Sequence, residues 1–433
     1  MKNNLTIGVD QNIPTSQGII LGLQHVLAMD IYVPPFIIAT ALSLAAGDAT
    51  GLIQSTFLAA GLASLIQVLF YLKLPVCQGP SFVPIGAIIG IYLGANGMGS
   101  VIGASIVGSV LIVILGFSGI YKYIVRNYIP SIVSGTIIMI VGLTLLPSAF
   151  NSNIYVSSNN LTINQNISLA AITAFTLVLF SSLGTYFKRY ARILQISSVI
   201  LALGVGTTVA YFMGGFSFKA ISEASFFSFP KLAFIDYSID FNFAAILTML
   251  VIYMVLLAET TGTWYAVSSV IDTPLTDNQV NKGVIGEGFG CLVSALVGST
   301  PVTGYSTNAG IISITGIASR KVFIFASGWF ILLSFLGKLA AIINSIPSSV
   351  IGGVFAVVCM IIMLNGFRVV KNADFSEREL YIIGIPLIFA IGLLFIPKEV
   401  VTSAPQMLQY LLNSPIAIGA IVAIIMNKVM PNK

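Results

Sequence analysis

Residues 78–84 read Gln-Gly-Pro-Ser-Phe-Val-Pro and residues 303–310 read Thr-Gly-Tyr-Ser-Thr-Asn-Ala-Gly, and both stretches interrupt long apolar sequence. Proline removes a backbone donor and glycine favours open backbone, so neither stretch predicts an ordinary helix facing lipid. Irregular backbone at membrane depth is tolerated only against protein or a water-filled cavity. Both stretches are therefore predicted to line a cavity, each followed by a half-helix whose amino-terminal dipole points inward.

The composition around these stretches is that of a membrane protein. Of 433 residues, 57% are hydrophobic and only 8% are charged, and the mean hydropathy is +1.00. Soluble globular chains do not reach such values. Because a bilayer core about 30 Å thick needs roughly 20 helical residues per crossing, the chain has room for about 12 to 14 spans. No sizeable soluble domain remains.

Apolar runs between polar or Pro/Gly breaks predict fourteen spans. They lie near residues 17–42, 50–71, 80–95, 98–119, 127–147, 167–186, 193–213, 243–262, 283–298, 306–316, 320–341, 348–366, 379–396 and 411–427. With both termini in the cytoplasm, fifteen of the 19 Lys and Arg residues fall on the cytoplasmic side, as the positive-inside rule requires. The net charge of +5 is thus a topology signal, and no nucleic-acid partner is expected. The polar stretches 148–166 and 214–242 are predicted external loops.

Two short sequences recur at a distance. Ile129-Pro130-Ser131 opens span five and Ile346-Pro347-Ser348 opens span twelve, and a weaker Pro-Val pair precedes spans three and ten. Seven crossings separate the copies, so they have opposite orientations in the membrane. The pattern predicts seven plus seven inverted repeats, with a substrate site near the midplane. The alternative is that Ile-Pro-Ser is only a common way to begin a span.

Five ionisable residues fall inside predicted spans: His25, Asp30, Glu259, Glu287 and Lys338. A charge there costs about 2.5–3.5 kcal/mol on insertion scales, so each invites a functional hypothesis. Glu259 ends a long apolar run with no cation nearby in sequence, which favours a carboxyl group that takes up and releases a proton during transport. The alternative is a structural pair with another helix.

The other candidates have structural alternatives. His25 is the only histidine, so a metal site is not expected, and it either holds a neighbouring helix or relays a proton. Glu287 and Lys338 lie near the ends of predicted spans, which indicates a structural role. Rings available for stacking, or for packing alone, belong to Tyr32, Phe82 and Tyr305.

Three motifs in order resemble the nucleobase-ascorbate transporter family, the group of xanthine, uric acid and uracil permeases. Gln24-His25-Val26-Leu27-Ala28-Met29 resembles the first-span Gln-His motif of that family. Ala258-Glu259-Thr260-Thr261-Gly262 resembles its eighth-span motif, and the stretch from Thr307 to Gly316 resembles its tenth-span signature. The similarity covers nearly the whole chain.

The resemblance implies an all-α integral membrane protein of fourteen spans with short strands in the interrupted spans three and ten. It implies a core domain formed by residues 1–119 and 243–341 and a gate domain formed by residues 120–213 and 342–433. It further implies a homodimer, in the inner or plasma membrane, that moves a nucleobase together with protons and needs no cofactor.

The same resemblance implies that Glu259 hydrogen-bonds the base and that backbone near Ser306 and Phe82 completes recognition. The residues predicted to bind substrate are Glu259, Ser81, Phe82, Tyr32, Ser306, Thr307 and Asn308, with Glu259 and His25 as candidates for proton coupling.

The chain departs from the family pattern at two positions. Thr307 stands where the family usually has Gln, Glu or Pro, and it makes no bidentate contact; Thr263 stands where relatives often carry Asp or His. Gly316 resembles the purine-type members, which favours an oxopurine over uracil. The main alternative is an anion transporter of the same architecture, since sulfate and bicarbonate carriers share this fold. An enzyme is not expected, because no nucleophile–base constellation is visible.

Overall fold

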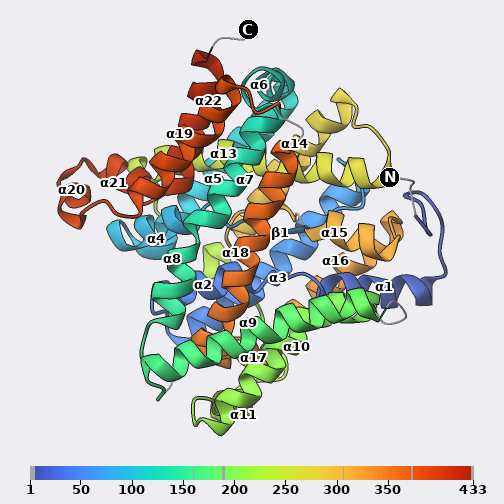
Figure 1. The fold of residues 1–433 in the computed structure, drawn as a ribbon, viewed down its shortest axis with the longest axis vertical. Helices are drawn as coiled ribbons and strands as arrows, with labels where there is room; N and C mark the ends of the chain where they lie inside the picture. The colour runs from blue at the N-terminus through green and yellow to red at the C-terminus, as the bar shows by residue number, and fades with distance from the viewer. Residues whose placement is uncertain (1–4, 159, 188–190, 306, 372–373, 431–433) are drawn as a thin grey trace.

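The computed structural model describes residues 5–158, 160–187, 191–305, 307–371 and 374–430, and it is almost wholly helical (Figure 1). The first half of the chain forms α1 (Thr15–Leu27), α2 (Val33–Ala41), α3 (Ala46–Leu69), β1 (Gln78–Pro80), α4 (Ile85–Gly94), α5 (Gly97–Ser118), α6 (Ile120–Tyr128), α7 (Ser131–Thr144), α8 (Leu146–Ala149), the π-helix η1 (Phe150–Ile154), α9 (Ile163–Tyr186), α10 (Ala191–Phe212), α11 (Lys219–Glu223) and α12 (Ala233–Asp236). The second half forms α13 (Phe243–Ile271), α14 (Asp277–Leu296), β2 (Val302–Gly304), α15 (Thr307–Thr315), α16 (Arg320–Ser334), α17 (Gly337–Ser345), α18 (Ser348–Val370), α19 (Glu377–Leu393), α20 (Lys398–Ser403), α21 (Gln406–Leu412) and α22 (Pro415–Val429).

Within the described residues, six helical stretches are long and apolar enough to cross a bilayer, or seven if the bent pair α21 and α22 forms one span. The chain is therefore a multi-pass membrane protein. Several other predicted spans are built from shorter pieces, and the count of fourteen stays a prediction.

Three of the predicted spans are divided between two helices each, a detail that the apolar pattern did not predict. The first, near 17–42, divides into α1 and α2 around residues 28–32, and α2 carries prolines 34 and 35 in its first turn, where a missing N–H is tolerated. The eleventh divides into α16 and α17, and the backbone N–H of Ser228 donates to the free carbonyl of Phe335 at that break. The fourteenth bends by 87° before Pro415, because proline does not continue a helix.

The Asn-rich segment 148–166 is more ordered than an external loop. It contains α8, η1 and the start of α9, and two of its asparagines are buried. The Asn153 side chain donates to the Ser148 carbonyl and the Asn166 side chain donates to the Val156 carbonyl, each at 2.6 Å. These asparagines therefore satisfy backbone acceptors where the helix pieces meet.

The two interrupted stretches pair with each other as the antiparallel strands β1 and β2, so the predicted short strands are present. Gln78 faces Gly304, Gly79 faces Thr303 and Pro80 faces Val302. The ladder continues past both ends, because Ser81 N–H donates to the Pro301 carbonyl at 2.9 Å and Tyr305 N–H donates to the Cys77 carbonyl at 3.0 Å.

Side chains from neighbouring helices satisfy the outer edges of this two-stranded sheet. Ser64 of α3 accepts from Gln78 N–H at 2.7 Å, and Thr260 of α13 accepts from Gly304 N–H at 2.9 Å. On β2 the thiol of Cys291 donates to the carbonyl of residue 302 at 3.1 Å. Backbone groups that water does not reach are thus paired, as a protein interior requires.

The long helices pack as two groups. The first helix group comprises α1, α3, α5, α13, α14 and α16, and the second helix group comprises α7, α9, α10, α18, α19 and α22. In Figure 1, α9 and α10 lie side by side below the centre and α18 runs through the middle of the view. Helices α7 and α18 begin directly after Pro130 and Pro347, the prolines of the two Ile-Pro-Ser sequences, and they pack closely on each other.

We expect Thr260→Val to lower the stability of the fold, because it leaves the Gly304 N–H without its acceptor in a buried place. An unsatisfied buried donor costs roughly 1–3 kcal/mol. The midpoint of thermal unfolding of the detergent-purified protein should fall. Thr208→Val is the matched control, since Thr208 is exposed and its hydroxyl bonds only the Gly204 carbonyl of its own helix. Equal midpoints for the two variants would contradict this role of Thr260.

We also expect Gly366→Ala to destabilise the contact between α7 and α18. A Cβ at Gly366 would lie 2.5 Å from the Met139 nitrogen and 2.6 Å from the Gly135 oxygen, both of which are backbone atoms. Overpacking of this kind costs about 1–3 kcal/mol. Gly384→Ala on α19 is the control, because nothing lies within 4 Å of its added Cβ. A thermal midpoint as low for the control as for Gly366→Ala would argue against a tight crossing.

Candidate functional site

Glu259 lies near the middle of α13, and its carboxylate is tied to the interrupted third span. The Ser81 hydroxyl donates to Glu259 Oε2 at 2.6 Å, and the same hydroxyl accepts from Val83 N–H at 3.1 Å. Ser81 is buried, whereas Glu259 is partly exposed. The carboxylate therefore lies next to the amino-terminal end of α4, where a helix dipole favours negative charge.

The next residue on α13, Thr260, contacts the other broken span through its hydrogen bond with Gly304. Consecutive residues of one helix thus hold the end of β1 and the end of β2. The structure brings together Glu259, Ser81 and the two strands, three of the features that sequence placed in the substrate site.

At the tenth-span break, two of the predicted residues take different positions. Thr307 is the first residue of α15, and its buried hydroxyl has no hydrogen-bond partner among the described residues. Asn308 is fully buried, and its side-chain N–H groups donate to the carbonyls of Cys77 at 3.0 Å and Tyr305 at 2.8 Å. Asn308 therefore fixes α15 to the residue before β1. Ser306 lies outside the described residues.

The predicted aromatic residues border the second helix group and the first-span break. Phe82 is buried and stacks on Phe355 of α18, with ring centroids 6.0 Å apart and an interplanar angle of 10°. Tyr32 lies between α1 and α2, and its buried hydroxyl has no partner in the part of the chain that the structure describes. Phe82 therefore marks the place where the third-span break meets α18.

His25 has the geometry of a packing residue. It is buried on α1, and its ring lies 4.6 Å from that of Phe323 on α16, tilted by 47°. Neither ring nitrogen bonds another described residue. The structure therefore places His25 between two helices of the first group, away from any hydrogen bond with Glu259.

Glu287 was assigned a structural role from its position near a span end, and that position is wrong. Helix α14 begins six residues earlier than expected, at Asp277, after a capping box of Thr276 and Gln279. Glu287 consequently lies in mid-helix, is 1% exposed, and accepts from the Gln67 side chain at 3.1 Å. The capping-box pattern Thr276-x-x-Gln279 is the sequence signal that would have placed the start of α14, and therefore Glu287, correctly.

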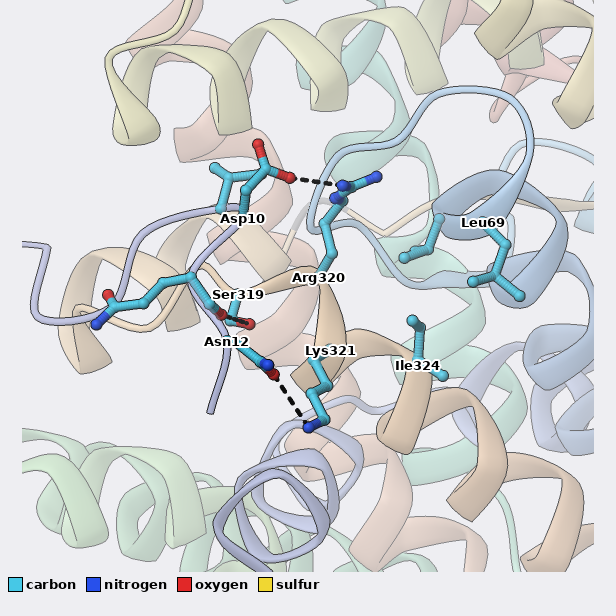
Figure 2. A pocket seen from close by; sticks show the side chains of 10 residues that line it. Asp10, Asn12, Leu69, Ser319, Arg320, Lys321 and Ile324 are labelled. Atoms are coloured by element: carbon cyan, nitrogen blue, oxygen red, sulfur yellow. Dashed lines mark hydrogen bonds and ion pairs between the residues drawn. The ribbon is translucent and has the colours of Figure 1, made fainter. Parts of the chain in front are cut away.

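A cavity of about 260 Å³ lies elsewhere, between the amino-terminal segment, the end of α3 and the start of α16 (Figure 2). Its cations are already held by their neighbours. Arg320 pairs with Asp10 at 2.5 Å, and Lys321 donates to the Asn12 side chain at 3.1 Å and to the Ile13 carbonyl at 2.8 Å. None of the residues predicted to bind substrate lines this cavity.

Two solved structures with a similar fold are those of a bicarbonate transporter and an anion transporter. The transmembrane domain of a cyanobacterium bicarbonate transporter, BicA, aligns over 98% of this chain and 100% of its own, with a TM-score of 0.61 and 17% identity. The inward-facing murine anion transporter Slc26a9 aligns over 94% of this chain and 67% of its own, with a TM-score of 0.65 and 12% identity. At such identities the likeness shows the fold alone.

Similarity in sequence is higher to purine-base permeases. The uric acid permease PucK of Bacillus subtilis is 31% identical over 96% of this chain and 96% of its own length. The xanthine permease of Bacillus subtilis is 28% identical over 94% of this chain and 92% of its own. The xanthine permease XanP of Escherichia coli K12 is 27% identical over 96% of this chain and 93% of its own length. A family model described as "Permease family" matches residues 16–399. The chain therefore belongs to the Permease family, the family of these xanthine and uric acid permeases.

Proposed function

We propose that the protein is a proton-coupled secondary transporter that takes up a nucleobase, with an oxopurine such as xanthine or urate favoured over uracil. The observation that carries this proposal is the Glu259 carboxylate, held by Ser81 where the two paired breaks meet. It offers an acceptor at membrane depth to a neutral ligand that presents N–H groups.

A planar base suits the groups that surround Glu259. Its ring edges alternate N–H donors and C=O acceptors, and the site offers a carboxylate, the free hydroxyl of Thr307 and backbone near the strand ends. Charge-assisted hydrogen bonds to a carboxylate are about twice as strong as neutral ones. The similarity to uric acid and xanthine permeases supports an oxopurine as the ligand.

We assign the coupling proton to Glu259. It takes part in none of the ion pairs found among the described residues, so no cation fixes its charge. His25 is left as a packing residue, because its nitrogens meet no polar group in the described part of the chain.

We further propose alternating access by an elevator-like movement of a core against a gate. The helix pattern supports seven plus seven inverted repeats, because β1 precedes α4 as β2 precedes α15, and α7 and α18 both follow an Ile-Pro-Ser sequence. The first helix group belongs to the predicted core, residues 1–119 and 243–341. The second belongs to the predicted gate, residues 120–213 and 342–433. We expect a homodimer in the cell membrane with cytoplasmic termini.

Anion transport is the second candidate, and the fold favours it, since a bicarbonate transporter shares the architecture. The site argues against it. An anion needs cations or free helix dipoles, whereas here a carboxylate already occupies the end of α4.

We expect Glu259→Gln to reduce nucleobase uptake by roughly tenfold or more, because a hydrogen bond to a charged group is worth about 1.5–3 kcal/mol. The measurement is uptake of labelled xanthine, urate, uracil and guanine, with and without a protonophore. Glu223→Gln is the control, because Glu223 is exposed on α11. If Glu259→Gln leaves base uptake unchanged, or if the protein takes up bicarbonate and the variant does so equally well, the anion transporter is favoured. If the protonophore does not reduce base accumulation, proton coupling is rejected.

We expect a disulfide between α7 and α13 to stop transport if the two groups move past each other. A Cβ at Gly262 would lie 3.0 Å from the Ser134 hydroxyl, so cysteines at these two positions are close enough to join. Uptake should fall on oxidation and return with a reductant, in a background without the native cysteines. A cysteine pair at Gly419 and Ala390 joins two helices of the same group and should not affect uptake. Transport by the oxidised Gly262–Ser134 pair would contradict the elevator proposal.

A further inference from the structure

Asp30 is a buried carboxyl group in the break between α1 and α2, and only 5% of it is exposed. It belongs to none of the ion pairs that the described residues form. Its Oδ1 accepts from the Tyr305 hydroxyl at 3.0 Å, across 275 positions of sequence. A buried carboxylate needs hydrogen-bond partners, so this bond is costly to lose.

Tyr305 connects Asp30 to the tenth-span break, because it follows β2 directly. Its carbonyl accepts from the backbone N–H of Asn308 at 3.1 Å and from the Asn308 side chain at 2.8 Å. Its ring lies against β1, where a Cβ added to Gly79 would come within 2.4 Å of a ring carbon. Gly304, the residue before Tyr305, donates its N–H to the hydroxyl of Thr260, the neighbour of Glu259 on α13, at 2.9 Å. Tyr305 therefore contacts both interrupted spans, the third through β1 and the tenth through Asn308.

We propose that Asp30 is a positioning residue that sets the selectivity of the substrate site, by accepting the Tyr305 hydroxyl and so fixing Tyr305, the residue after β2, relative to Glu259. The proposal rests on the nucleobase function proposed above and adds a residue from the first-span break to it. Asp30 acts through Tyr305.

The link to selectivity follows from how a polar site rejects a wrong base. A base that mismatches fixed donors and acceptors leaves buried polar groups unpaired, and that penalty provides the discrimination. The hydroxyl of Thr307 and the backbone of Gly304 and Tyr305 keep fixed positions only while Tyr305 is held. If Tyr305 shifts by a fraction of an ångström, the site adapts to other bases, and the difference in affinity between bases shrinks.

The test is a double-mutant cycle with Asp30→Ala, which removes the acceptor, Tyr305→Phe, which removes the donor, and the double variant, measured as KM and maximal uptake rate for each base that the wild type transports. Each single variant should raise KM for the preferred base by roughly tenfold, and so reduce the ratio of each competitor's KM to that of the preferred base. The double variant should match the single ones, since all three lack the same bond. Asp30→Glu should recover part of the ratio.

Tyr253→Phe is the matched control, because it removes another buried hydroxyl from the first helix group, and it should leave the KM ratio unchanged. Additive effects in the double variant, or lower maximal rates with unchanged KM ratios, would overturn the proposal. So would variants that fail to reach the membrane or that unfold, because that result assigns the bond to the fold alone. If the wild-type protein transports no base, the proposed function itself is contradicted. If the wild type transports bases and the variants keep the same ratio of KM values, only the role of Asp30 is contradicted.

Discussion

The pairing of β1 with β2 is the constraint on which the arrangement depends. Two stretches, more than 200 residues apart in sequence, each abandon the helix inside a membrane protein, and each exposes backbone donors and acceptors that lipid does not satisfy. They satisfy one another, and hydroxyls from α3 and α13 complete the edges. Neither break is stable in this form without the other, so the two halves of the chain meet at one fixed place.

The pairing of the two strands also explains the position of the Glu259 carboxylate. Helix α13 contacts both strands through adjacent residues, so Glu259 lies beside the end of β1 with Ser81 as its partner. Asp30 and Glu287 approach the same region from the first-span break and from α14, through Tyr305 and Gln67 respectively. Three acidic groups near one interrupted region are expensive in a membrane, and function is the usual reason for such an expense.

Sequence was sufficient for the features that local chemistry determines. Proline and glycine in apolar runs predicted the two breaks, the family resemblance predicted their short strands, and hydropathy predicted a multi-pass protein. The features that the sequence did not predict depend on contacts between residues distant in sequence or on the positions of helix ends. The division of the first span was not predicted, although two prolines start a new helix at α2, and Glu287 was misplaced because the start of α14 was put six residues late. No local pattern shows that Asp30 accepts a bond from Tyr305 across 275 residues.

The most direct test is an experimental structure of the protein in lipid nanodiscs with xanthine or urate bound. The account predicts ring density beside the ends of β1 and β2, with a base nitrogen within hydrogen-bond distance of the Glu259 carboxylate. Base density in the cavity beside Arg320, or a Glu259 side chain directed at lipid with the base bound elsewhere, would contradict it.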